Sequence, residues 1–252
     1  MKGIPGLITD EGKYVENQVI PCYQTDGAKR LKPSGFMDIA QEMAFRAAQS
    51  MGFGYDQLLL EGKAWVLYRF HFRCIKVPRW REEVQVSTWN RGPFGPLYYR
   101  DFRLEGENSE ILATSSWIVL DVAGRRVCRS AEALSAIPEK YRCDEAVLEE
   151  PAPKIVIPAN LQEEFVGMHR VGYADIDMLG HTNNARYMAW ATECVDFGDA
   201  EGLEPADVFI NFIHETKAGD EVSLYRARDG RTYYVDGRVG DEVSFTVRID
   251  FK

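Results

Sequence analysis

The sequence has few of the residues that form disulfide bonds or bind metals in small proteins. It has five cysteines, an odd number without a C-x-x-C pair, so we expect free thiols in a reducing compartment rather than disulfides or a zinc knuckle. Its four histidines lack metal-ligand spacing. The phosphate-binding loop G-x-x-x-x-G-K-[ST] and the serine elbow G-x-S-x-G are also absent. We therefore expect no metal and no cofactor.

Long apolar runs and excess positive charge are missing too. No stretch of about 18 apolar residues occurs, and residues 1–13 lack the apolar core of an export signal, so we expect a cytoplasmic protein with no membrane span. The 30 basic residues are outnumbered by 39 acidic ones, and the net charge of -9 disfavours nonspecific nucleic-acid binding. A local basic patch can still attract an acidic partner.

The 252 residues, 45% of them hydrophobic, suffice for a substantial core. An amphipathic helix is predicted after Ser34, its expected N-cap, with an apolar face from Phe36 to Met51. Alternating patterns predict strands around it, at 17–23, 64–77, 83–90, 97–104 and 111–121.

The same order returns after residues 138–160, where four prolines and an acidic cluster are typical of a linker. A second amphipathic helix follows, and strands are predicted at 166–173, 207–214, 221–228, 231–239 and 243–250. We predict an α+β duplication with one helix on a mostly antiparallel sheet in each half. The predicted domains are 1–137, the N-terminal scaffold, and 161–252, the catalytic C-terminal unit.

Chemistry concentrates before the second helix. Residues 173–196, YADIDMLGHTNNARYMAWATECVD, place two acids, a histidine and two asparagines ahead of an apolar stripe. We expect Asn183 or Asn184 to cap this helix. Taken alone, His181 and Asn183 are also consistent with a loop-to-helix cap only, and Asp175 with a carboxylate that bonds its own turn.

These residues resemble a known family. The string D-x-D-x-x-x-H-x-N-N-x-x-Y-x-x-W that starts at Asp175, with residues 65–89 and INFIHET at 210–216, is similar to the acyl-carrier-protein thioesterases of plants and bacteria. The resemblance implies a tandem hotdog fold, in which each half wraps a long antiparallel sheet around one helix. It also implies a cofactor-free hydrolase that releases fatty acids from its partner, acyl carrier protein.

The resemblance assigns the family's catalytic aspartate to Asp177, its histidine to His181 and its glutamate to Glu215. Asn183 and Asn184 are expected to support or bind the substrate. An acid would take a proton from water, His181 would orient that water or shuttle the proton, and helix-start amides would stabilise the oxyanion. Which acid is the base stays open, and so does direct attack on the thioester by Asp177.

Two positions depart from the family's pattern. Leu179 stands where plant enzymes usually have an asparagine, so Asn183 or a backbone group takes over that hydrogen bond, or the bond is missing. Thr216 stands where plant enzymes have a cysteine once proposed as nucleophile, which excludes a cysteine mechanism at this position. Cys194 is expected to be a buried packing residue.

Substrate binding requires an apolar tunnel and a docking surface. Large side chains of the first helix are candidates for the tunnel, although core packing explains them equally well: Phe36, Met43, Phe45 and Met51. The acidic carrier could dock on either of two basic groups, for which solvated strand faces are the alternative: Arg69, Arg73, Lys76, Arg79 and Arg81, or Arg125, Arg126 and Arg129.

Other functions stay open at this stage. An acyl-coenzyme A thioesterase needs the same catalytic set, a hotdog dehydratase also pairs a histidine with an acid, and Leu179 makes a noncatalytic acyl-binding protein conceivable. Both a monomer and a homodimer are compatible with the sequence, because two hotdogs in one chain already supply the pairing that single-hotdog proteins obtain by dimerising.

Overall fold

The computed structural model describes residues 6–124, 126–128 and 137–252. The strands are β1 (Leu7–Ile8), β2 (Tyr14–Val19), β3 (Lys63–Lys76), β4 (Glu83–Phe94), β5 (Leu97–Gly106), β6 (Glu110–Asp121), β7 (Arg126–Val127), β8 (Glu164–Arg170), β9 (Pro205–Phe212), β10 (Glu221–Asp229), β11 (Thr232–Val239) and β12 (Glu242–Phe251). The α-helices in this part of the chain are α1 (Pro33–Ser50), α2 (Tyr55–Leu60), α4 (Asn184–Glu193) and α5 (Phe197–Gly202).

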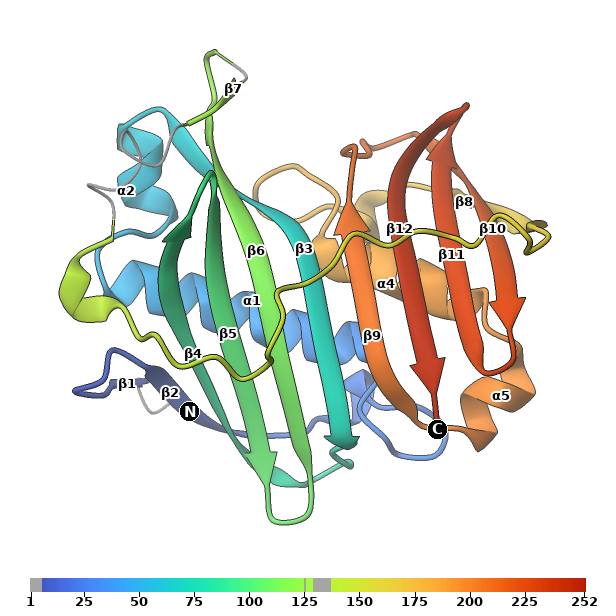
Figure 1. Cartoon of the computed structure of the whole chain (residues 1–252), viewed down its shortest axis with the longest axis horizontal. Coiled ribbons are helices and arrows are strands. Elements are labelled where there is room, and N and C mark those ends of the chain that lie inside the picture. Colours follow the sequence, from blue (N-terminus) through green and yellow to red (C-terminus); the bar gives the residue numbers. More distant parts are fainter. Residues whose placement is uncertain (1–5, 125, 129–136) are drawn as a thin grey trace.

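The strands form one sheet in the order β1-β2-β4-β5-β6-β3-β9-β12-β11-β10-β8, with β7 paired to β6. Every neighbouring pair on this path is antiparallel. From the central β3–β9 pair outward, the orders β6-β5-β4-β2 and β12-β11-β10-β8 match each other, and each half contributes one long helix to the same face of the sheet (Figure 1). The predicted α+β tandem hotdog is confirmed.

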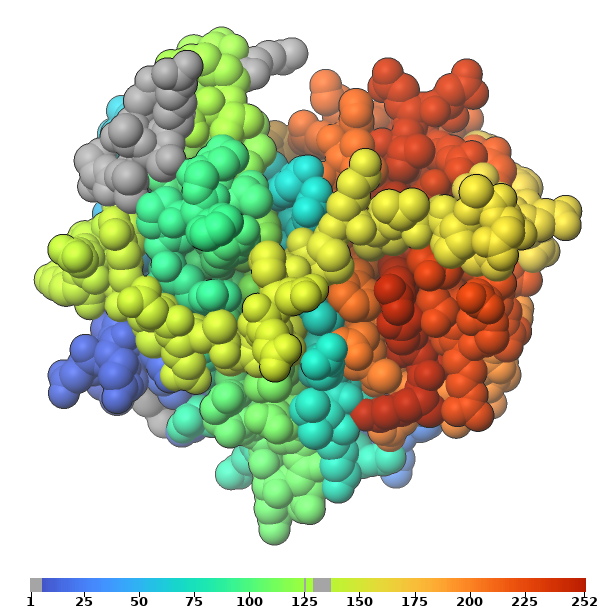
Figure 2. All heavy atoms as spheres, in the orientation of Figure 1, coloured from blue at the N-terminus to red at the C-terminus, as the bar shows by residue number. Residues whose placement is uncertain are grey.

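The two halves meet edge to edge at β3 and β9, from Arg69 opposite Asn211 to Arg73 opposite Asp207. His71 Nε2 lies 2.8 Å from Asp207 Oδ1 across this seam. Residues 142–163, the linker segment, comprise most of the predicted linker and the three residues after it and cross the face of the sheet that is opposite to α1 and α4 (Figures 1 and 2). Its Ile155 amide donates to Asn211 Oδ1 at 2.7 Å, so the linker segment is fixed to the seam.

The amphipathic pattern of α1 matches its packing against the sheet. Its apolar face is buried as predicted, and Phe36 packs on Phe72 of β3 with ring centroids 5.0 Å apart. The predicted N-cap Ser34 is wrong, because the helix begins at Pro33 with Lys32 as its N-cap. Proline suits the first helical position, since its fixed φ is helical and its missing N–H has no helical partner there.

Helix α4 starts where the sequence predicted. Asn183 is its N-cap, and its Oδ1 accepts a hydrogen bond from the Ala185 amide at 2.8 Å. Tyr187 and Trp190 are both buried on this helix. Cys194 is buried as expected, and burial raises its pKa to about 11.

Most predicted strands are present within a few residues of their predicted ends. The first is displaced: it was predicted at 17–23 but ends at Val19, because the chain turns into a 3-10 helix at Cys22–Gln24. The strand predicted at 166–173 ends at Arg170 for a similar reason, a 3-10 turn at Tyr173–Asp175. No helix in the described part of the chain is long and apolar enough to cross a membrane.

Candidate active site

The loop before α4 is held in shape by a carboxylate. Asp177 Oδ1 accepts hydrogen bonds from the backbone amides of Leu179, at 2.8 Å, and His181, at 3.3 Å. The Asp177 amide in turn donates to the His181 carbonyl oxygen at 2.8 Å, and Gly180 takes the φ of 80° that the tight turn requires. Asp177 therefore fixes the backbone from which the His181 side chain projects.

A histidine and a carboxylate meet beside this loop. His181 Nε2 lies 3.3 Å from Glu215 Oε1, although 34 residues separate them in the chain. Their side chains are 60% and 45% exposed, so water reaches both. The structure thus brings together two of the three residues that the family resemblance assigned to catalysis, His181 and Glu215. The described contacts of the Asp177 carboxylate are with its own loop.

Thr216 anchors the segment that carries Glu215. Its side chain is fully buried, and its hydroxyl lies 2.8 Å from Thr182 Oγ1 and 3.0 Å from the Tyr187 hydroxyl. The Thr216 amide donates to the Tyr187 hydroxyl at 3.0 Å, and Thr182 donates to the Thr216 carbonyl at 2.9 Å. These bonds join the Glu215 segment to the loop that carries His181 and to α4.

Asp175, the first acid of the motif, bonds its own turn as the sequence suggested. Its Oδ2 accepts from the Gly172 amide at 2.8 Å and lies 3.0 Å from His169 Nε2. Burial raises the pKa of Asp175, but these hydrogen bonds outweigh burial and hold the pKa below its ordinary value. The His169 ring packs on Trp190 of α4 with centroids 4.4 Å apart. Asp175 and His169 therefore connect the start of the loop to β8 and α4.

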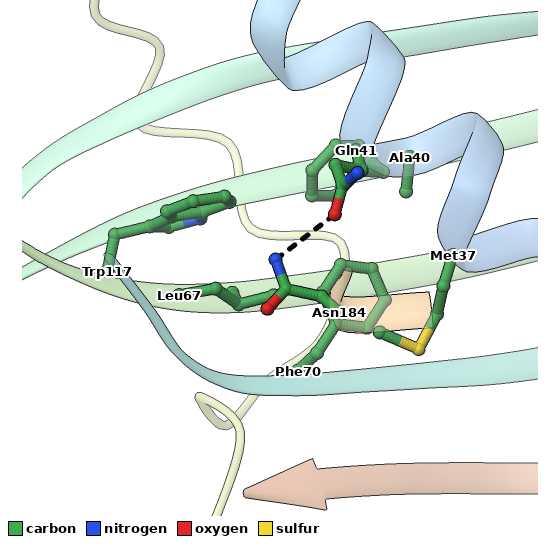
Figure 3. A pocket seen from close by; sticks show the side chains of 8 residues that line it. Met37, Ala40, Gln41, Leu67, Phe70, Trp117 and Asn184 are labelled. Atoms are coloured by element: carbon green, nitrogen blue, oxygen red, sulfur yellow. Dashed lines mark hydrogen bonds between the residues drawn. The ribbon is translucent and has the colours of Figure 1, made fainter. Parts of the chain in front are cut away.

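The two motif asparagines have different partners. Asn183 is occupied by helix capping, whereas Asn184 reaches across to the first half of the chain, where its Nδ2 donates to Gln41 Oε1 at 3.1 Å (Figure 3). The Leu179 side chain cannot form the hydrogen bond of the family's asparagine. Its backbone amide, however, donates a hydrogen bond to Asp177.

An apolar cavity adjoins this bridge between the halves. Its walls come from α1 and from β3, β5 and β6 of the first half, closed by one residue of the second: Met37, Ala40, Gln41, Leu67, Phe70, Phe102, Trp117 and Asn184. The cavity volume is about 10 Å³. The predicted tunnel residues Phe36, Met43, Phe45 and Met51 do not line this cavity; Phe36, Met43 and Met51 are buried in the core, as the packing alternative expected, and Phe45 is exposed.

Three cavity residues were not predicted from the sequence: Met37, Gln41 and Trp117. The one available signal was Gln41, a polar residue directly after the apolar Ala40 of the helical stripe. Nothing in the local pattern of Trp117 distinguishes a cavity wall from ordinary strand packing. His169 was missed too, because its partner Asp175 lies beyond the end of its strand.

Comparison with known proteins identifies the family. Residues 11–137 match the model of the acyl-ACP thioesterase N-terminal domain, and residues 159–251 match the model of the C-terminal domain. The chain is 27% identical over 240 residues to oleoyl-acyl carrier protein thioesterase 1, chloroplastic, of Arabidopsis thaliana, with 86% of this chain and 64% of that protein covered. It is 26% identical over 231 residues to a chloroplastic palmitoyl-acyl carrier protein thioesterase of Gossypium hirsutum, with 84% and 54% covered. It thus spans between 54% and 64% of the length of these two relatives.

Solved structures show the same fold. An acyl-ACP thioesterase from Bacteroides thetaiotaomicron VPI-5482 superposes with a TM-score of 0.87 at 22% identity, covering 97% of this chain and 100% of that one. The 12:0-ACP thioesterase from Umbellularia californica gives 0.83 at 17% identity, with 96% and 97% covered. At these identities the likeness concerns the fold alone.

Proposed function

Because the chain belongs to the acyl-ACP thioesterase family, we propose that it hydrolyses the thioester of fatty acyl-acyl carrier protein and releases the free fatty acid. The observation that carries this proposal is the His181–Glu215 pair, 3.3 Å apart and open to water, beside the start of α4. The apolar cavity lined in part by Asn184 is the candidate site for the acyl chain, which fits there only after lining side chains move.

In the proposed reaction, Glu215 orients the His181 ring through Nε2, which leaves Nδ1 to take a proton from water. The water oxygen bonds to the thioester carbonyl carbon, and negative charge develops on the carbonyl oxygen. As the C–S bond breaks, the imidazolium returns the proton to the departing sulfur. Between these two proton transfers, the Glu215 carboxylate stabilises the positively charged ring of His181. Backbone amides at the start of α4 carry partial positive charge and stabilise the oxyanion.

We assign Asp177 a positioning role in this scheme. Its Oδ1 accepts the amides of Leu179 and His181, so it sets the backbone that aims the imidazole. The rival role for Asp177 is attack on the thioester, which forms an anhydride that water then opens. Label in the enzyme after a single turnover in isotopically labelled water supports an anhydride that water opens at the Asp177 carbonyl, and its absence favours direct attack by water.

The decisive assay compares acyl carrier protein and coenzyme A thioesters of one acyl chain, with wild type, His181→Ala and Glu215→Gln. Preferential release of free acid from the carrier protein, lost in both variants, supports the proposal. Preference for coenzyme A would make the protein an acyl-CoA thioesterase. Enoyl product from a 3-hydroxyacyl substrate without free acid would make it a dehydratase, and turnover unchanged by His181→Ala would leave only acyl binding.

We propose that the acidic carrier protein docks through basic residues of the predicted groups. In the structure, two of these residues form ion pairs with carboxylates of the same chain. Arg73 pairs with Asp207 at 2.8 Å and Arg79 with Glu204 at 3.6 Å. Arg125 and Arg129 of the second predicted group lie outside the described residues. Added salt should raise KM for the carrier substrate, because it screens exposed charges.

A cytoplasmic location is part of the same proposal. All five cysteines are free thiols, which suits a reducing compartment.

A further inference from the structure

Two amide side chains join the halves of the chain at the edge of the apolar cavity. Gln41 comes from α1, and Asn184 is the first residue of α4, three positions after His181. Figure 3 shows the hydrogen bond between them, 3.1 Å from Asn184 Nδ2 to Gln41 Oε1. This pair, the amide bridge, therefore connects a wall of the cavity to the first residue of the helix that follows the His181 loop.

The residues that line the cavity differ in exposure. Gln41, Asn184 and Trp117 are half-buried, whereas Met37, Leu67 and Phe70 are buried. A volume of about 10 Å³ is near the least that holds a single water molecule, so an acyl chain does not fit until lining side chains move.

The lining groups differ in their freedom to move. Trp117 is held by a hydrogen bond from its Nε1 to Ser115 Oγ at 2.7 Å. Phe70 and Phe102 pack on each other with ring centroids 5.6 Å apart and are buried in the core. Met37 has a flexible unbranched side chain, and the two half-exposed amides can exchange their mutual hydrogen bond for water. Separating the amide bridge, with a shift of Met37, is thus the least costly way to open the cavity.

We propose that the amide bridge closes the acyl pocket and that Gln41 thereby determines which acyl chain lengths are hydrolysed. This inference rests on the proposed thioesterase function. A short acyl chain reaches the catalytic pair without separating the bridge. A long chain must separate Gln41 from Asn184 before it enters the cavity, so its binding carries the cost of that hydrogen bond.

The test is Gln41→Leu, which keeps the size of the side chain and removes its acceptor. KM is measured over a series of saturated acyl carrier protein thioesters from short to long. We expect the ratio of long-chain to short-chain KM to fall about two- to tenfold, the equivalent of one hydrogen bond. Asn184→Ala should lower the same ratio, and the double variant should lower it no further, because both changes remove one interaction.

Two matched variants act as controls. Gln41→Glu keeps an acceptor oxygen for Asn184 Nδ2 and should retain the length preference. Gln49→Leu makes the same substitution on the exposed side of α1, where Gln49 Nε2 donates to Asp56 Oδ2 at 2.7 Å, and should leave the KM ratio at its wild-type value. Thermal unfolding of all variants identifies any loss of fold.

A second measurement does not depend on catalysis. Calorimetric titration with free fatty acids of increasing length should show tighter binding of long chains to Gln41→Leu than to wild type. If wild type hydrolyses no acyl thioester, the proposed function fails, while this titration still tests the amide bridge. Equal effects of Gln41→Leu on all chain lengths in both measurements, or a Gln49→Leu variant that behaves identically, would overturn the inference.

Discussion

Replacing Thr216 by valine tests whether a buried hydroxyl network holds Glu215 in place. The Thr182 hydroxyl hydrogen goes to the Thr216 carbonyl, so the Thr216 hydroxyl donates to Thr182 and the Tyr187 hydroxyl donates to Thr216. Valine has nearly the same shape but no hydroxyl. In Thr216→Val, the Tyr187 hydroxyl loses its acceptor in a site where the side chain at 216 has no exposed surface.

The magnitude follows from that single unpaired group. A buried donor left without a partner costs about 1–3 kcal/mol. For a protein of this size each kcal/mol lowers Tm by about 2–4 °C, so a loss near the middle of that range lowers Tm by about 4–8 °C. Because Glu215 is the preceding residue, its carboxylate should shift relative to His181, and kcat should fall about ten- to a hundredfold while KM changes less. Calorimetry and steady-state kinetics measure the two effects.

Two further variants make this reasoning refutable. Thr216→Ser keeps the hydroxyl and loses one methyl, so it should retain most of kcat at a stability cost of about 1 kcal/mol. Tyr187→Phe removes the acceptor of the Thr216 amide, and the double variant should lose less stability than the sum of the single losses. A Thr216→Val protein with the Tm and kcat of wild type would show that the network does not position Glu215.

The remaining predictions concern the loop before α4 and the proposed catalytic pair, His181 and Glu215. His181→Ala and Glu215→Gln should each lower kcat about 10²- to 10⁴-fold, and the double variant little further, because the two groups act as one unit. Hydrogen bonds hold the pKa of Asp175 below its ordinary 3.8 despite burial, so its carboxylate stabilises the fold above about pH 4 and this stabilisation is lost as the pH falls through the lower folded pKa. Asp175→Asn should therefore flatten the acid limb of stability in pH-dependent urea unfolding. Leu179→Ala should change kcat less than about threefold, whereas Leu179→Pro, which removes the amide that Asp177 accepts, should lower it at least about tenfold in the same assay.

Periodicity was sufficient to predict both long helices and the antiparallel sheet, because burial of one face imposes a repeat that the sequence must show. Element ends depended on turn chemistry instead. The proline at position 33 outweighed Ser34 as a helix-start signal, and the turn at Cys22–Gln24 ended β2 earlier than its apolar pattern suggested. Both deviations come from local backbone preferences that an apolar stripe does not encode.

From the local pattern alone, the candidate site was predictable only where it is contiguous in the chain, and Glu215 came from the family resemblance. The motif around His181 and Asn183 could be found in one segment, but the cavity arises where α1 meets α4 and the first half-sheet. On α1, Phe36 packs against the sheet, while Met37 and Gln41 lie on the side that approaches α4. Phe36 and Met37 are adjacent in the sequence but lie on different faces of α1. Only the packing of the second half determines which of these faces lines a cavity.

The duplicated halves differ in chemistry at equivalent structural positions. Helix α1 starts at a proline with no side-chain cap, whereas α4 starts after the Asn183 cap with His181 two residues before it. Strand β3 ends at Lys76, but the segment after β9 carries Glu215. Each half therefore keeps the helix and sheet, but only the second keeps a histidine and an acid at the helix start. Seven of the eight cavity residues come from the first half. On the proposed function, substitutions in the first half can thus change acyl selectivity without altering His181 or Glu215. The amide bridge is the place where the cavity of the first half contacts α4 of the second half.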